Sequence, residues 1–330
     1  MRIIIRTPNF IGDTIMMLSA FELLKQKYPN ASYTIVTKAP CVDIFRDKGV
    51  DEIIIDDSKS SNKRRCRRIF QLIHKIRSKQ YDLGILFHNT FLDALIFKLS
   101  NIKTLIGYEK EHRKVLLDFW LPIDRNRHYI NHYAYLINAF LGHPYQTLPL
   151  PILPTQATAL IYKGENPLVG FVLGGENKNS RQYPKELSFE LFEQLKDQKI
   201  DIVFLGDQED AKSHDSYAKY LKKSSLLNTR DLSGATSVAE LIDIIASLDL
   251  LITIDTSAMH IAAATQTPFI TLVGKGTSIF EVVQPKVDFG IYLREDNANI
   301  DDNNLIANIK PAIIKDTIAR CLDANSKKIQ

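Results

Sequence analysis

The sequence predicts an α/β protein of two domains, each built on a parallel β-sheet. Short segments rich in Ile and Val alternate along the chain with longer segments of helical periodicity, which is the pattern of βαβ units. The length of 330 residues is more than one ordinary hydrophobic core requires, and it indicates about two domains. A proline-rich segment near the middle of the chain separates two such series, so we place the domain boundary there.

The first series occupies residues 1–150. It opens with an apolar strand pattern, and the Tyr-Pro-Asn sequence at residues 28–30 ends the helix that follows. The expected strands are residues 3–6, 33–37, 53–55 and 83–87, and the expected helices are residues 13–27, 64–79 and 92–99.

The second series occupies residues 151–330. Residues 142–154, at the junction of the two series, carry four prolines, and this spacing favours an extended connector over regular structure. The expected strands of the second series are residues 168–173, 202–205, 250–254 and 269–273, and the expected helices are residues 187–198, 238–247, 257–265 and 313–322.

The composition is that of a packed globular protein, with 45% hydrophobic and 24% charged residues. The net charge of +4 hides an asymmetry, because residues 1–150 contain 23 Lys and Arg against 14 Asp and Glu, whereas residues 151–330 contain 19 against 24. A basic domain beside an acidic one indicates an anionic partner for the first. The sign of the charge leaves open whether that partner is a nucleic acid, a phosphorylated small molecule or a membrane surface.

The cysteines and the apolar segments bear on the compartment. Cys41, Cys66 and Cys321 are odd in number and form no C-x-x-C motif, so neither a disulfide framework nor a zinc site is indicated. The apolar run at residues 3–5 is far too short for the core of a signal peptide, and no stretch reaches the ~20 apolar residues of a membrane-spanning helix. We therefore expect a cytoplasmic protein.

The first candidate site is the turn at residues 7–14, between a buried strand and the helix that follows it. Ligands of parallel sheets gather outside the carboxyl ends of the strands, so this turn points into a crevice. Gly12 permits close approach of the backbone to a ligand. Asp13 is a candidate general base, but an Asp at a helix start is more often a cap whose charge suits the helix dipole.

The second candidate site lies where the expected strand 250–254 meets the next helix. The residues Asp255, Thr256 and Ser257 open that helix, and its free backbone N–H groups suit a diphosphate. His260 lies in the first turns of the same helix. A cap at Asp255 or Thr256 and a packed His260 are the structural alternatives.

Two further segments follow strands of the second domain. Gly174 and Gly175 let a backbone approach a ligand closely, while Lys178 and Arg181 offer charge for phosphate oxygens. An ordinary turn explains the two glycines equally well. The carboxylates at residues 207–210 could accept hydrogen bonds from ribose hydroxyls, although such a run is usually solvated charge.

Four motifs, taken together, resemble one protein family. They are Pro-Asn-Phe-Ile-Gly-Asp at residues 8–13, Arg-Gln-Tyr-Pro at 181–184, Asp-Leu-Ser-Gly at 231–234 and Asp-Thr-Ser-Ala-Met-His-Ile-Ala-Ala-Ala at 255–264. Their order and spacing resemble the bacterial ADP-heptose:lipopolysaccharide heptosyltransferases of glycosyltransferase family 9. The first motif, with Asn-Thr-Phe at 89–91, Gly-Tyr at 107–108 and Glu-His-Arg at 111–113, is most similar to the heptosyltransferase II subgroup. The resemblance covers residues 1 to about 280.

The resemblance implies a fold and an activity. The fold would be two Rossmann-like domains facing a cleft (GT-B type), with the acceptor on residues 1–150 and the nucleotide-sugar on residues 151–330. The activity would be inverting transfer of L-glycero-D-manno-heptose from ADP-heptose to the inner core of lipopolysaccharide or lipooligosaccharide, adding the second heptose to a lipid A-Kdo-heptose acceptor. No cofactor or metal is expected, and the sequence contains no Asp-x-Asp triplet, which agrees with metal independence.

The resemblance also implies roles for individual residues. Asp13 would be the general base, and Arg181 would stabilise the charge of the leaving group. The expected nucleotide-sugar contacts are Gly174, Gly175, Lys178, Asp210, Thr236, Asp255, Thr256, Ser257 and His260. The expected acceptor contacts are Asn9, Asn89 and Arg113.

Three positions depart from the family pattern. Ser257 replaces a Gly, so the geometry of the phosphate loop must differ if that position needs a positive φ. Arg181 stands where the family usually has Lys, and a planar fork there replaces a compact ammonium. Lys275 interrupts the usual Gly-Pro-Thr-Ser and adds charge near the same site.

A basic cluster, Lys-Arg-Arg-Cys-Arg-Arg, occupies residues 63–68. A block of like charge is commonly only solvated. The functional interpretation has the cluster, together with Arg113, meeting phosphates of a lipopolysaccharide core or the anionic inner leaflet. With the resemblance, this implies peripheral contact with the inner membrane, no nucleic-acid partner and a monomer.

Three alternatives remain. An NAD-dependent oxidoreductase would share the α/β pattern, but no G-x-G-x-x-G follows the first strand. A non-catalytic two-lobed sugar-binding protein would also close around its ligand, although such proteins usually need export. A GT-B transferase that uses another nucleotide-sugar is the third alternative.

Overall fold

The chain divides into two compact units, Met1–Pro154 and Thr155–Gln330. The division lies at the last proline of the segment 142–154, close to the expected boundary at residue 150. The structure, a computed structural model, describes residues 1–58, 65–158, 160–161, 164–224, 228–276, 278–295 and 302–326. Over these residues, neither unit has a helix long and apolar enough to cross a bilayer.

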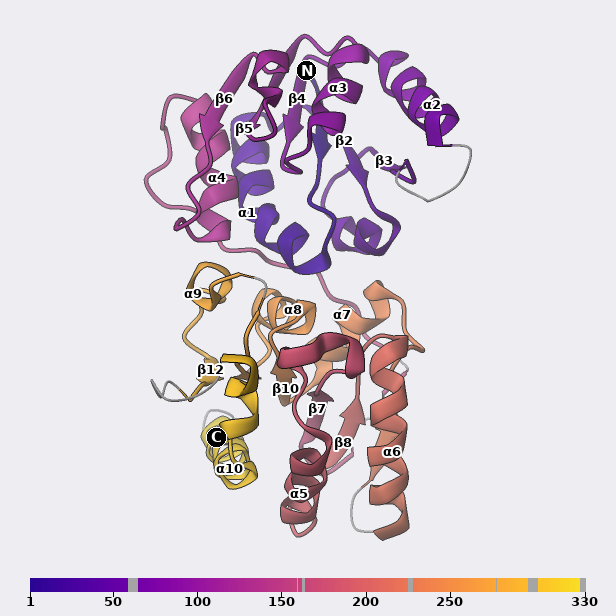
Figure 1. Cartoon of the computed structure of the whole chain (residues 1–330), viewed down its shortest axis with the longest axis vertical. Helices are drawn as coiled ribbons and strands as arrows, with labels where there is room; N and C mark the ends of the chain where they lie inside the picture. The colour runs from indigo at the N-terminus through magenta and orange to yellow at the C-terminus, as the bar shows by residue number, and fades with distance from the viewer. Residues whose placement is uncertain are drawn as a thin grey trace. The chain divides into compact units, whose positions relative to one another are not determined.

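The first unit has a six-stranded parallel sheet among its described residues, in the order β3-β2-β1-β4-β5-β6 (Figure 1). This order is that of a doubly wound Rossmann sheet. The strands are β1 (Arg2–Arg6), β2 (Ser32–Thr37), β3 (Glu52–Ile55), β4 (Leu83–Leu86), β5 (Thr104–Glu109) and β6 (Phe119–Pro122). The α-helices are α1 (Ile11–Lys27), α2 (Arg65–Arg77), α3 (Phe91–Leu99) and α4 (Tyr129–Phe140).

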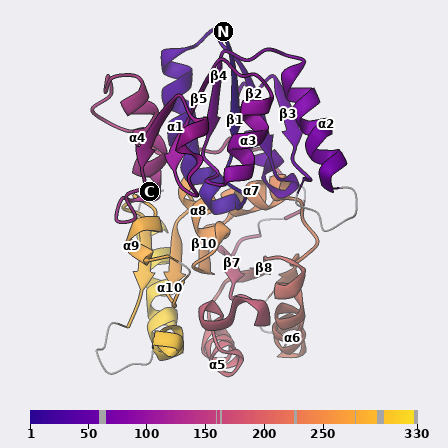
Figure 2. The ribbon, with the colours of Figure 1, turned by 45° about the horizontal axis from the view of Figure 1, so that its top comes forward.

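The central strand β1 shows why both faces of this sheet are covered. Ile3, Ile4 and Ile5 are all fully buried, and a strand with apolar side chains on both faces needs cover on both. Ile4 shares a hydrophobic cluster with Ile76 of α2 and Phe97 of α3, while α1 packs against α4. Figures 1 and 2 show α2 at the end of the unit where β3 lies and α4 at the opposite end.

The second unit repeats the same winding in the order β12-β11-β10-β7-β8-β9, so the α/β class predicted from the sequence is confirmed in both units. Its strands are β7 (Leu168–Val172), β8 (Asp201–Phe204), β9 (Thr229–Asp231), β10 (Leu250–Ile254), β11 (Phe269–Leu272) and β12 (Gly290–Leu293). Its α-helices are α5 (Lys185–Leu195), α6 (Gln208–Ser224), α7 (Val238–Ser247), α8 (Ser257–Thr265), α9 (Phe280–Val283) and α10 (Pro311–Ser326).

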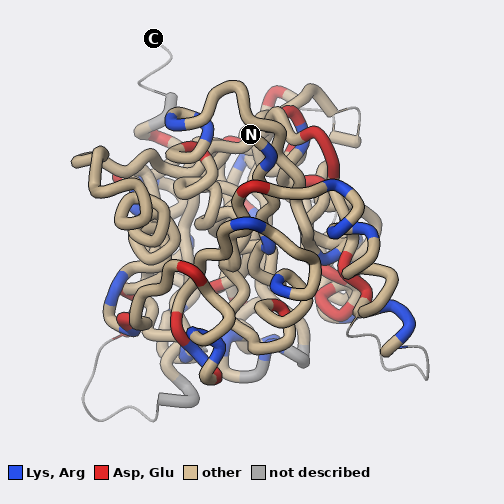
Figure 3. The backbone as a smooth tube through the Cα atoms, turned by 90° about the horizontal axis from the view of Figure 1, so that it is seen from above, with Lys and Arg blue, Asp and Glu red and all other residues tan. Residues whose placement is uncertain are grey.

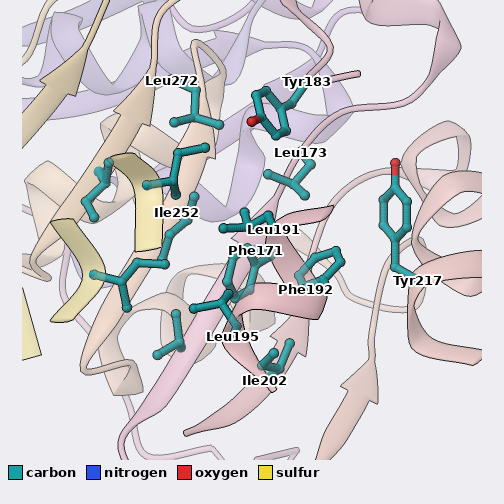
Figure 4. Close-up of a cluster of buried hydrophobic side chains, with 14 of the residues drawn as sticks. Phe171, Leu173, Tyr183, Leu191, Phe192, Leu195, Ile202, Tyr217, Ile252 and Leu272 are labelled. Atoms are coloured by element: carbon teal, nitrogen blue, oxygen red, sulfur yellow. The ribbon is translucent and has the colours of Figure 1, made fainter. Parts of the chain in front are cut away.

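An aromatic cluster forms part of the core of the second unit (Figure 4). The ring of Phe192 on α5 lies 5.3 Å from Phe171 of β7, 5.4 Å from Phe204 of β8 and 5.5 Å from Tyr217 of α6, between ring centroids. Aromatic pairs at these separations stabilise a core beyond the area that they bury. The cluster therefore holds α5 and α6 against the two strands whose carboxyl ends carry candidate site residues.

Seven strands and α-helices of the described residues are absent from the sequence prediction: β5, β6, α4, α6, β9, α9 and β12. Three of them, β6, β9 and β12, are short strands at the edges of the sheets, and edge strands carry little apolar alternation. Helix α6 is largely polar, with Tyr217, Ala218 and Leu221 as its buried hydrophobic residues, so its apolar stripe is narrow.

The aromatic cluster leads to a stability prediction. We expect Phe192→Ala to lower the free energy of unfolding of the second unit by about 3–5 kcal/mol, because it removes a buried ring and leaves a cavity. Hydrogen exchange of the β7 and β8 amides measures this loss within the unit. Ile279→Ala, at an exposed side chain of the same unit, is the control and is expected to change protection little. Unchanged protection in Phe192→Ala would contradict the assigned core.

Candidate functional site

Arg6, the last residue of β1, organises the carboxyl edge of the first sheet from inside. Its buried guanidinium donates to the carboxylate oxygens of Asp93 and Asp56, at 3.2 and 2.9 Å, to Asn9 Oδ1 at 2.9 Å and to the carbonyl of Thr7 at 2.8 Å. Both carboxylates are themselves buried. One cation thus ties the turn after β1 to the segments that follow β3 and β4.

The same cluster determines the state of His88, which follows β4. Because Arg6 donates to Asn9 Oδ1, the amide nitrogen of Asn9 faces His88 and donates to its Nε2, at 2.8 Å. Nε2 is then an acceptor, and Nδ1 on the other side of the ring donates to Asp93. Burial opposes ionisation of Asp93, but this hydrogen bond and the charge of Arg6 hold the pKa of that carboxyl well below its usual range.

The predicted acceptor residue Asn9 therefore already has two side-chain partners in the free protein. One amide hydrogen of Asn9 remains for a ligand. Asn89 is engaged as well, since its Oδ1 accepts from Arg113 at 2.7 Å. The structure thus ties both asparagines into buried polar groups at the carboxyl end of the sheet.

Arg113 is not part of a surface basic cluster, which corrects the expectation that it meets phosphates together with residues 63–68. Its exposed fraction is 0%, and its guanidinium also donates to the carbonyls of Tyr108 and His88, both at 2.7 Å. Burial lowers its pKa to about 10. Two consecutive left-handed residues, Glu111 (φ 54°) and His112 (φ 58°), precede Arg113 where its side chain turns into the protein.

Asp13 is not a helix cap. Helix α1 begins at Ile11, its N-cap residue is Phe10, and no side chain caps it. Asp13 lies in the first turn, and its carboxylate forms no hydrogen bond or ion pair with any residue that the structure describes. Burial raises its pKa to about 6. A partly buried carboxyl with a pKa near neutrality and with unused oxygens is suited to general-base chemistry.

In the second unit, the structure brings Arg181 to the segment after β10. The guanidinium donates to the carbonyl of Asp255 at 3.1 Å. Burial raises the pKa of the Asp255 carboxyl, and the charge of Arg181 opposes that rise. Gly276 is adjacent, because a Cβ atom there would lie 2.8 Å from Asp255 Oδ2. Arg181, Asp255 and the turn that contains Gly276 therefore form one group.

Helix α8 begins beside this group. Thr256 is its N-cap residue, and its side chain makes no capping hydrogen bond, so the first N–H groups of the helix stay available to a ligand. Ser257 is the first helical residue and does not have a positive φ, so the substitution of the family's Gly introduces no backbone strain. His260 is almost completely buried one turn later, where packing limits its access to a ligand.

The two glycines after β7 have a packing role that the sequence did not show. Gly174 has a φ of +84°, which favours glycine. A Cβ atom at Gly175 would lie 2.5 Å from the carbonyl oxygen of Glu209. The close approach that glycine permits at residue 175 was predicted for a ligand, but in the structure the backbone at the start of α6 makes it.

The carboxylates after β8 neutralise Lys178. Its Nζ lies 2.6 Å from Asp207 Oδ2 and 4.0 Å from Asp210 Oδ1, so this lysine is not a free phosphate ligand in the structure. Asp210 is 3% exposed, and its Oδ1 has no hydrogen-bond partner among the described residues. Burial raises the pKa of Asp210. Thr236, in the loop before α7, is half-buried.

The sequence motifs do not include the charged groups that hold the turn after β1 in place. Arg6, Asp56 and Asp93 were not candidates, and neither was His88. A usable signal was present at Arg6, because a charged residue that ends a run of buried isoleucines needs a partner. Over the described residues, no three His, Cys, Asp or Glu side chains group as metal ligands would, and the metal independence of the reaction stays a prediction.

Comparison with known proteins supports the motif-based resemblance. The sequence profile of glycosyltransferase family 9 (heptosyltransferase) matches residues 69–281. Lipopolysaccharide heptosyltransferase 2 of Salmonella typhimurium is 26% identical over 299 residues, which cover 85% of this chain and 84% of the relative. Lipooligosaccharide heptosyltransferase 2 of Haemophilus influenzae is 24% identical, with 83% of each chain covered.

Solved structures show the same fold. ADP-heptose lipopolysaccharide heptosyltransferase II of Escherichia coli superposes with a TM-score of 0.85 at 23% identity, covering 99% of this chain and all of the other. The fold is thus the predicted GT-B type of two Rossmann-like units. A heptosyltransferase of E. coli solved with ADP-2-deoxy-2-fluoro heptose superposes with a TM-score of 0.75 at 17% identity, over 97% of this chain and 99% of that chain. Because the family profile spans more than half of the sequence, this chain belongs to glycosyltransferase family 9, the heptosyltransferases, and is a glycosyltransferase.

Proposed function

We propose that this glycosyltransferase moves L-glycero-D-manno-heptose from ADP-heptose to the inner core of lipopolysaccharide or lipooligosaccharide, adding the second heptose with inversion. The observation that carries the proposal is Asp13, a carboxylate with unused oxygens and a pKa near 6 at the carboxyl end of β1. Relatives named heptosyltransferase 2 that match most of the chain support the choice of acceptor. The related structure that contains a fluorinated ADP-heptose supports the choice of donor.

The proposed reaction is a single displacement. The acceptor hydroxyl attacks the anomeric carbon of the heptose, the new C–O bond forms as the bond to ADP breaks on the opposite face, and Asp13 takes the hydroxyl proton. ADP leaves with additional negative charge. In this proposal, Arg181, which donates to the carbonyl of Asp255, and the N–H groups at the start of α8, at Thr256 and Ser257, stabilise that charge.

The remaining donor contacts divide by chemistry. Asp255 and His260, with the backbone at Gly174 and Gly175, belong to the phosphate end of the proposed site, and Lys178 borders that end while it is paired with Asp207. Asp210 and Thr236 belong to the ribose and adenine end. Oδ1 of Asp210 is the strongest of these, because it is buried, lies 4.0 Å from the Lys178 ammonium and accepts no hydrogen bond from the described residues, so a ribose hydroxyl would complete it.

On the acceptor side, Asn9 and Asn89 are the proposed contacts, and Arg113 acts on the acceptor through Asn89. The acceptor is lipid-linked, so the proposal places the enzyme on the cytoplasmic face of the inner membrane. The enzyme is proposed to be a monomer. Helix α2 is the element suited to such contact. Its sequence carries no acidic residue, and Phe70 on it is 70% exposed. Figure 3 marks the basic positions of the chain in blue; Lys63 and Arg64 of the predicted cluster lie outside the described residues.

The reaction itself is tested by mass spectrometry. A mixture of the protein, ADP-heptose and a delipidated core acceptor that carries one heptose is expected to gain the mass of one heptose. NMR of the product is expected to show the anomeric configuration opposite to that of the donor. No mass gain would refute the donor assignment, and retained configuration would refute the single displacement.

The role of Asp13 predicts a pH profile. A base works only when it is deprotonated, and the raised pKa of Asp13 means that kcat/KM rises with pH through about 6 and then levels off. Asp13→Asn is expected to lower kcat by ~10²–10⁴-fold while ADP affinity and stability are kept. Asp57→Asn, at an exposed carboxylate of the same unit, is the matched control. An acidic limb near pH 4, or transfer by Asp13→Asn at the normal rate, would rule out this base.

The buried position of Arg113 predicts a structural effect. Lys in its place cannot reach the carbonyls of Tyr108 and His88 and the amide of Asn89 together, so Arg113→Lys is expected to lower the stability of the first unit by about 2–4 kcal/mol. Urea unfolding followed by fluorescence of Trp120, the single tryptophan, reports on this unit. Arg67→Lys on α2 is the exposed control. Unchanged stability with a raised acceptor KM would show direct contact instead.

The proposed membrane contact of α2 predicts binding to anionic vesicles. The wild-type protein is expected to co-sediment with vesicles rich in phosphatidylglycerol and not with pure phosphatidylcholine. Phe70→Ser and Arg67→Glu should both reduce this binding without changing turnover of a delipidated acceptor, whereas Val115→Ser, at an exposed apolar residue elsewhere in the unit, should not. Equal binding by all variants would exclude α2 as the contact.

A further inference from the structure

Hydrogen bonds join three loops at the carboxyl edge of the second sheet, those that follow β7, β8 and β9. The N–H of Gly234, in the loop after β9, donates to the carbonyl of Gly206 after β8 at 2.9 Å. The N–H of Leu232 donates to the carbonyl of Phe204 at 3.0 Å. The third loop, which begins at Leu173 after β7, is joined to them by His214 of α6, whose exposed fraction is 0%.

The hydrogen bonds of His214 determine where its proton lies. Its Nε2 is 3.4 Å from the backbone nitrogen of Leu173, and a peptide N–H can only donate, so Nε2 accepts and carries no hydrogen. The ring proton is therefore on Nδ1, which lies 2.7 Å from Ser233 Oγ and donates to it. Burial lowers the pKa of His214 to about 4, so the ring keeps this neutral form at physiological pH.

This arrangement leaves the hydroxyl of Ser233 as a directed donor. A serine hydroxyl has one hydrogen and two lone pairs, and His214 occupies a lone pair. The hydroxyl hydrogen has no acceptor among the residues that the structure describes. Ser233 is half-buried, and its backbone is held in place because its N–H donates to Asp231 Oδ1 at 2.9 Å and Gly234 next to it has a φ of +69°.

The place of Ser233 along the sheet edge indicates which part of a ligand it meets. The proposed diphosphate group follows β10, and Ser233 follows β9, which is three strands away in the sheet order, or roughly 14 Å at the usual strand spacing. Ser233 also adjoins the start of α6, since a Cβ atom at Gly234 would lie 3.0 Å from Cα of Gln208. The proposed ribose acceptor Asp210 lies in the first turn of that helix.

We infer that Ser233 Oγ donates a hydrogen bond to the nucleoside half of the bound nucleotide, at a ring nitrogen or a ribose oxygen, and that His214 is the positioning residue that aims it. The inference rests on the proposed nucleotide-sugar donor. Because the hydroxyl is already oriented in the free protein, the ligand does not have to order it on binding. Among the described residues, Asp210 Oδ1 accepts no hydrogen bond and the Ser233 hydroxyl hydrogen has no acceptor, and an acceptor and a donor of this kind together complement a nucleoside.

The experiment is calorimetric titration of the full chain with ADP. Ser233→Ala is expected to raise the Kd for ADP about five- to tenfold, as the loss of one neutral hydrogen bond does. Ser233→Thr keeps the hydroxyl and is expected to restore most of the affinity. Ser247→Ala, at a half-buried serine of α7 that bonds to its own helix, is the matched control and should bind as the wild type does.

Variants of His214 test the positioning. His214→Phe removes both ring hydrogen bonds and is expected to weaken ADP binding by a similar factor, whereas His214→Asn keeps a donor near the position of Nδ1 and should weaken it less. In the double variant Ser233→Ala/His214→Phe, the two effects should not add, because both remove the same hydrogen bond to the ligand. Full additivity would overturn the role given to His214.

Two further outcomes separate this inference from the proposed function. Pyrophosphate, measured by competition, should bind Ser233→Ala as tightly as the wild type, and an equal loss for pyrophosphate and ADP would overturn the assignment to the nucleoside half. An unchanged Kd in Ser233→Ala, with heptose transfer by the wild type intact, overturns the inference and leaves the proposed function standing. Failure of the wild type to bind ADP overturns both.

Discussion

The buried guanidinium of Arg6 is the interaction on which the first unit's candidate site depends. It ends the central strand, where a positive charge would be costly without partners, and it is held by two buried carboxylates and two oxygens of the adjacent turn. Removing one partner of such a group costs about 3–5 kcal/mol, because the remaining charge stays buried. The same group orients Asn9 and, through it, His88, so the turn that leads to Asp13 has one arrangement.

Asp13 differs from the two buried carboxylates that Arg6 binds. Asp56 and Asp93 are buried with cations and keep lowered pKa values, whereas Asp13 is partly buried without a partner and has a raised one. This contrast among the three carboxylates is a physical basis for assigning the base. Burial without a cation destabilises the ionised form of Asp13, and taking the proton of a bound hydroxyl group relieves that cost. It also agrees with the absence of any capping role for Asp13.

In the second unit, close backbone contacts at glycines hold the loops at the edge of the sheet together, whereas in the first unit the charge of Arg6 does so. Gly175 and Gly276 permit contacts that a Cβ atom would prevent, and each brings a loop against the segment that follows a neighbouring strand. Lys178 is neutralised by the carboxylates after β8, which leaves Arg181 and the start of α8 as the groups suited to an anion. The neutral His214 joins the loops after β7 and β9 without adding charge there.

The sequence by itself determined the α/β class and most of the strands of both units, and it indicated the Asp13 and Asp255 segments as candidates, because apolar periodicity and short motifs are local properties. It did not show the short edge strands β6, β9 and β12 or the polar helix α6, because short edge strands and a narrow apolar stripe leave little periodicity in the sequence. Only the tertiary structure decided that Arg113 is buried, that Ser257 needs no positive φ, that Lys178 is paired and that His214 is neutral. Those properties depend on which distant groups meet a side chain, and distances between segments are not written in local sequence.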